Sequence, residues 1–111
     1  MTYNNKKFET MGEIFNEALR LAKKNKKEAL EFFKAYIQYI LEDADDINTL
    51  EEAEERAKHN FGYFAGYYSA DVCKLIYKTF QCTHPIFGDK PFEVSPEEAF
   101  RLGQESARKH K

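Results

Sequence analysis

The sequence HNFGYFAGYY spans residues 59–68 and is the most distinctive stretch of the chain, because five of its ten residues are Phe or Tyr. Gly62 and Gly66 are four residues apart and therefore lie on one face of a helix. A glycine inside a helix costs about 1 kcal/mol relative to alanine. Two such glycines on one face predict that another helix, a loop or a ligand approaches this backbone closely.

The same stretch places His59, Tyr63 and Tyr67 in one row along the helix. A buried tyrosine needs a hydrogen-bond partner for its hydroxyl. Two interpretations stay open: core packing with the hydroxyls at the surface, or a wall that stacks against a partner protein or a flat ligand. The functional interpretation predicts a shallow groove at the two glycines, flanked by phenol rings and occupied by another molecule.

Working outward, apolar residues at helical spacing and N-capping residues predict about five helices. Residues 59–68 close the third of them. The first follows Thr10 and ends at the lysines of 23–27, the second spans about 26–43, the third begins after Thr49, the fourth spans about 70–81, and the fifth begins at Ser95.

Residues 82–94, CTHPIFGDKPFEV, are predicted to form one long ordered loop that contains prolines. Pro85 favours an extended backbone at His84. Ile86 and Phe87 are too apolar to extend into water, so the loop must lie on the helices or on a partner. Residues 1–9 are predicted to be a flexible polar arm, and residues 10–111 a single domain. The predicted fold is all-α, a compact helical bundle.

The composition fits a globular domain and excludes general disorder, with 111 residues that are 42% hydrophobic, 32% charged and 15% aromatic. The formal net charge of −2 argues against binding duplex nucleic acid, which normally needs a basic excess. The charges are unevenly spread, since residues 20–27 contain no acid and residues 42–55 contain no base. These stretches are two solvated helix ends or a device that orients a partner.

The sequence predicts a cytoplasmic protein without a membrane partner. No stretch reaches the ~18 apolar residues that a membrane span needs, and no apolar run follows the first lysines. Cys73 and Cys82 are the only cysteines, and we expect free thiols in a reducing compartment. The sequence alone gives them no role.

Residue types that support catalysis or metal binding are present, but their spacing is wrong. Cys73, Cys82 and His84, with His59 or Asp71, lack the close pairs of a zinc site. Cys73, His84 and Asp71 lack the signature of a nucleophilic cysteine family. Glycine-rich phosphate-binding motifs are missing. We therefore predict no metal, no cofactor and no catalytic residue.

Three phrases resemble a group of short uncharacterised proteins from bacteriophages and prophages. They are NFGYFAGYY at 60–68, HPIFG at 84–88 and SPEEAFRLG at 95–103, and the resemblance covers about residues 50–103. It implies a phage origin and the cytoplasm of a host cell. It implies no reaction.

These observations predict a small non-enzymatic binding protein that inhibits a host or defence factor by occupying it. Two alternatives stay open: a protein that binds a small molecule such as a nucleotide signal, and a homo-oligomer in which the glycine face pairs with its symmetry mate. The predicted binding residues are His59, Tyr63, Gly66, Tyr67, His84 and Phe87.

Overall fold

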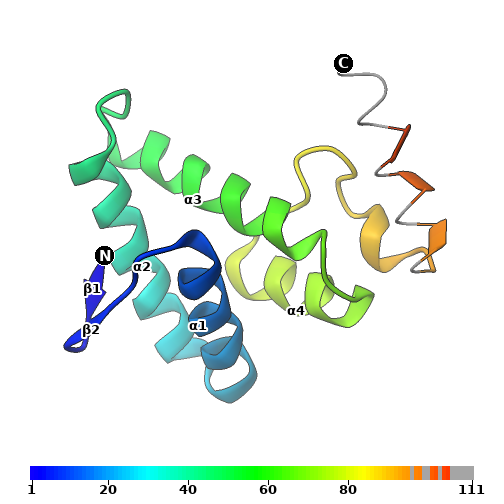
Figure 1. Cartoon of the computed structure of the whole chain (residues 1–111), viewed down its shortest axis with the longest axis horizontal. Coiled ribbons are helices and arrows are strands. Elements are labelled where there is room, and N and C mark those ends of the chain that lie inside the picture. Colours follow the sequence, from blue (N-terminus) through cyan, green and yellow to red (C-terminus); the bar gives the residue numbers. More distant parts are fainter. Residues whose placement is uncertain (96, 99–100, 103, 106–111) are drawn as a thin grey trace.

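In the computed structural model, which describes residues 1–95, 97–98, 101–102 and 104–105, four α-helices follow a short β-hairpin (Figure 1). The prediction of a mainly helical, compact chain is confirmed. None of the helices in these ranges is long and apolar enough to cross a membrane. The helices are α1 (Met11–Lys24), α2 (Lys26–Asp43), α3 (Leu50–Ala65) and α4 (Ala70–Phe80).

Each helix begins at a polar residue whose side chain satisfies a backbone N–H of the first turn. Thr10, Asn25, Thr49 and Ser69 accept these N–H groups at 2.9–3.4 Å. Such a cap stabilises a helix by about 1 kcal/mol. Asn25 also ends α1, because its backbone N–H bonds to the carbonyl of Leu21, so one residue separates two helices.

Residues 1–9, which the sequence predicts to be a flexible polar arm, contain a short β-hairpin. Strands β1 (Thr2–Tyr3) and β2 (Lys6–Lys7) pair antiparallel across a two-residue turn. The turn residues Asn4 and Asn5 have φ values of 50° and 65°, and a positive φ at both central residues is what a tight hairpin turn requires. Phe8 is only 3% exposed and anchors the hairpin in the core. The Asn4-Asn5 pair is a local sequence signal for this turn, whereas the polar composition of residues 1–9 does not indicate it.

Phe61 of α3 lies at the point where all four helices meet. Its ring is fully buried and contacts Phe15 of α1, Phe33 and Tyr36 of α2, and Phe80 of α4, with centroids 5.0–5.7 Å apart. The aromatic stretch 59–68 therefore supplies the centre of the core as well as part of the surface.

The predicted third helix is shorter than expected, and the predicted loop is divided. α3 ends at Ala65, so Tyr67 and Tyr68 lie in the turn that follows it. The segment after α4 contains a β-bridge between His84 and Gly88 and the 3-10 helix η1 (Lys90–Phe92). In the predicted fifth helix, the Ser95 hydroxyl accepts the amide of Glu98 at 3.2 Å, while residues 96, 99–100, 103 and 106–111 lie outside the described part.

Candidate functional site

The glycine face of α3 is covered by the protein's own loop. A Cβ atom at Gly62 would overlap the carbonyl oxygen of Thr83, and a Cβ at Gly66 would overlap the ring of His84. The predicted close approach is therefore real, and the loop is what approaches. The expected groove that a foreign molecule occupies is not present, because Thr83 and His84 fill it.

His84 holds the loop in this position. Its side chain is 4% exposed, and Nδ1 accepts the amide N–H groups of Ile86 and Phe87 at 3.0 and 3.1 Å. The imidazole stacks on Phe87 with centroids 4.2 Å apart and on Tyr63 at 5.6 Å. The ring thus ties the loop to itself and to α3 at once.

Burial, with a smaller electrostatic contribution from nearby His59, lowers the pKa of His84 to about 4. At neutral pH the imidazole therefore carries no charge. Neutral imidazole has one acceptor nitrogen, and the two loop amides identify it as Nδ1. Protonation at this atom would replace the acceptor with a donor that faces two other donors.

Tyr63 and Tyr67 form an exposed pair beside His84. Tyr63 is 38% exposed and Tyr67 is 72% exposed. The Tyr67 hydroxyl donates to the Tyr63 hydroxyl at 2.7 Å, and the two rings meet edge to face at 5.3 Å. Ile86, on the same loop as His84, is 48% exposed. We call Tyr63, Tyr67 and Ile86 the aromatic surface.

The structure brings most of the predicted binding residues together but assigns them different roles. Rings follow one another from Tyr67 to Tyr63, His84 and Phe87, and Gly66 lies against the edge of His84. Within this group Tyr63 and Tyr67 are exposed, and the buried His84 packs against Tyr63. His59 is exposed on α3, one turn before Tyr63.

The two cysteines are buried and protonated at neutral pH. The Cys73 thiol donates to the carbonyl of Ala65 at 2.8 Å. Burial raises the pKa of Cys73, and it raises the pKa of Cys82 to about 12. The thiolate is the nucleophilic form of cysteine, so these thiols are inert in this environment. Within the described ranges, His, Cys, Asp and Glu form no group of three that is able to hold a metal ion.

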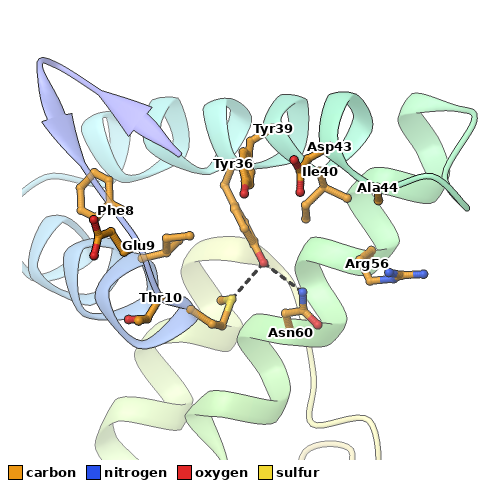
Figure 2. Close-up of a pocket in the computed structure, with 12 residues that line it drawn as sticks. Phe8, Glu9, Thr10, Tyr36, Tyr39, Ile40, Asp43, Ala44, Arg56 and Asn60 are labelled. Atoms are coloured by element: carbon orange, nitrogen blue, oxygen red, sulfur yellow. Dashed lines mark hydrogen bonds between the residues drawn. The ribbon is translucent and has the colours of Figure 1, made fainter.

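A second candidate site is a cavity of about 240 Å³, which no sequence pattern predicts (Figure 2). It lies between the end of the hairpin, the start of α1, the second half of α2 and the middle of α3. Tyr36, which is 4% exposed, directs its hydroxyl into this region. That hydroxyl donates to the Met11 sulfur at 3.0 Å and accepts from the Asn60 amide at 2.9 Å.

Comparisons of the chain with protein-family models, with curated proteins and with solved structures found no match. The aromatic surface offers phenols and an aliphatic side chain on a fixed support. The cavity offers carboxylates, acceptor atoms and aromatic rings in a concave setting.

Proposed function

We propose that this chain is a small binding protein that contacts another protein through the aromatic surface of Tyr63, Tyr67 and Ile86. The observation that supports this most directly is the exposure of Tyr67 beyond the end of α3, at 72%, while its hydroxyl is fixed by Tyr63. Tyrosine is enriched in protein interfaces, where its ring supplies apolar area and its hydroxyl supplies direction.

The surface is already ordered before any partner arrives. Tyr63 is stacked on His84, which is held by two loop amides and by the glycine face of α3. Ordering a mobile side chain on binding costs about 0.5–1.5 kcal/mol. A tyrosine pair that is held in place avoids part of this cost, which favours a contact surface over a purely structural role.

The proposed partner is a host or defence protein that offers an apolar depression with acceptors for the phenol hydroxyls, in line with the resemblance to phage proteins. Charge supplies the orientation. Residues 20–27 and 42–55 flank the two ends of α2, whose 18 residues span about 27 Å. Opposite charges at that separation favour one docking direction over its reverse.

The two alternative functions are less well supported at this surface. A homo-oligomer that pairs through the glycine face would first have to displace Thr83 and His84. A nucleotide that stacks on the tyrosines needs basic groups nearby for its phosphates. The lysine-rich connection between α1 and α2 lies well apart from the loop after α4 (Figure 1), so this densest basic stretch does not supply them.

Replacing Tyr67 by alanine is expected to weaken partner binding at least tenfold, which corresponds to about 1.4 kcal/mol. The free energy of unfolding should change by less than about 0.5 kcal/mol, because the ring is mostly exposed. The measurement has two stages. Wild-type protein captures candidate partners from a bacterial lysate, and each purified candidate is then titrated against both proteins by calorimetry.

Leu50→Ala is the matched control, since Leu50 is 57% exposed at the opposite end of α3. It should leave the partner's Kd within twofold. Equal losses of affinity in both variants would show that the candidate partner binds nonspecifically to exposed apolar side chains. A fall in Tm of many degrees in Tyr67→Ala would instead assign the ring to the fold, and the proposal would be wrong.

A further inference from the structure

The cavity beside Tyr36 has an excess of negative charge. Glu9 and Asp43 contribute carboxylates to its lining, and Arg56 is the one basic residue there. Arg56 is engaged elsewhere, because its guanidinium binds Asp46 at 2.6 Å. Figure 2 shows its side chain extending away from the Tyr36 hydroxyl. Glu9 in turn forms an ion pair with Lys7 at 3.8 Å. The cavity therefore faces its occupant with one carboxylate, that of Asp43, which neither Arg56 nor Lys7 offsets.

The position of Asp43 adds to this negative potential. Asp43 is the last residue of α2, and the last turn of α2 contains no basic residue. A helix carries a partial negative charge at its C-terminus, so a carboxylate there is unfavourable unless a cation is near. Among the residues that the structure describes, Asp43 forms no ion pair. A bound cation would offset both the carboxylate charge of Asp43 and the partial negative charge of the helix end.

The lining also suits the organic part of a cation. Tyr39 contributes an aromatic ring, whose face attracts ammonium groups, while Tyr36 is stacked on Phe61 and contributes its hydroxyl end. The Asn60 amide is used toward the Tyr36 hydroxyl, which leaves its carbonyl oxygen as an acceptor. Ile14 and Ile40 provide apolar surface for an alkyl chain.

We infer that this cavity binds a primary alkylammonium group, carried either by a free amine or by a lysine side chain of another protein. The ammonium lies at the mouth beside Asp43, and the alkyl chain lies against the aliphatic and aromatic lining. A volume of about 240 Å³ admits a chain of this size and falls below the ~300–1,000 Å³ of drug-sized sites. The inference is independent of the proposed function of the aromatic surface.

The test is a titration of the labelled protein with n-butylammonium chloride, followed by amide chemical shifts at constant ionic strength. We expect saturable shifts at the Asn60 side-chain amide and at the backbone of residues 9–11 and 43–44. The neutral analogue 1-butanol should bind at least tenfold more weakly. Equal binding of the two probes would mean that the site recognises only an alkyl chain, and the inference would be overturned.

Asp43→Asn should weaken n-butylammonium binding at least tenfold without harming the fold, because it removes a carboxylate from a helix C-terminus. Asp45→Asn is the matched control, since Asp45 is exposed, carries the same charge and does not line the cavity. It should change the Kd less than twofold. Equal losses in the two variants would show bulk attraction to an acidic surface and would contradict the inference.

A second titration distinguishes the two sources of the ammonium group. Nα-acetyl-lysine N-methylamide presents the same butylammonium on a peptide backbone. Binding as tight as that of n-butylammonium supports a lysine from a partner protein, and binding of n-butylammonium alone supports a free amine. If neither probe shifts the Asn60 amide, the cavity does not recognise the ammonium group and the inference fails.

Discussion

Replacing Gly62 by alanine is expected to lower the free energy of unfolding by about 2–3 kcal/mol, although alanine is the better helix former. Gly62 lies inside α3, where the exchange alone would stabilise the helix by about 1 kcal/mol. The added Cβ would overlap the Thr83 carbonyl oxygen and lie 2.9 Å from the carbonyl carbon. Both atoms belong to the backbone, so the whole loop must move away from the helix.

Urea denaturation of the wild type and the variant measures this loss. Gly12→Ala serves as the control, because a Cβ at Gly12 meets only Thr10 Oγ1 at an ordinary 3.8 Å. Gly12→Ala should be neutral or slightly stabilising. If Gly62→Ala is equally neutral, the loop does not pack on the glycine face in solution, and the support proposed for the aromatic surface is lost.

Lowering the pH from 7.5 to 5 should remove about 2 kcal/mol of stability through His84 alone. Its pKa is about 4 in the folded protein, against an ordinary value of 6.5. Between these values the unfolded chain binds the proton and the folded chain does not. The stabilising contribution is therefore complete above pH 6.5 and is lost progressively as the pH falls toward 4.

The structural reason is that Nδ1 cannot accept the amides of Ile86 and Phe87 once it is protonated. His84→Asn isolates this effect, because an asparagine side-chain oxygen accepts a backbone N–H two residues on and does not titrate. The variant should be less stable at pH 7.5, and its deficit relative to the wild type should shrink by about 2 kcal/mol at pH 5.

His59→Gln is the matched histidine control. His59 is exposed and acts on His84 only as a secondary influence, after burial. This variant should keep most of the loss of stability between pH 7.5 and 5. If the wild type and His84→Asn instead lose stability in parallel, carboxylates account for the pH dependence of stability. In that case protonation of His84 does not release the loop.

The helices were predictable because their signals are local. Thr10, Asn25, Thr49 and Ser69 each satisfy an amide within the next three residues, so residue type and spacing decide the outcome. The hairpin at Asn4 and Asn5 was local too, and attention to turn geometry would have predicted it.

The candidate sites were only partly predictable. The sequence identified the glycine face and the tyrosine pair, since both depend on a spacing of four residues at the end of α3. It did not identify what covers the glycines. A helix, a loop or a ligand satisfies the same spacing, and only the packing of Thr83 and His84 selects the loop.

No sequence pattern predicted the cavity beside Tyr36. Its lining comes from the hairpin end and from three helices, and no motif joins Met11, Tyr36 and Asn60. Sequence patterns alone predict where helices begin and that the glycine face of α3 is approached closely, because capping and periodicity act over a few residues. The loop that covers this face, the burial of His84 and the cavity follow from folding, because they depend on contacts between segments that are distant in the sequence.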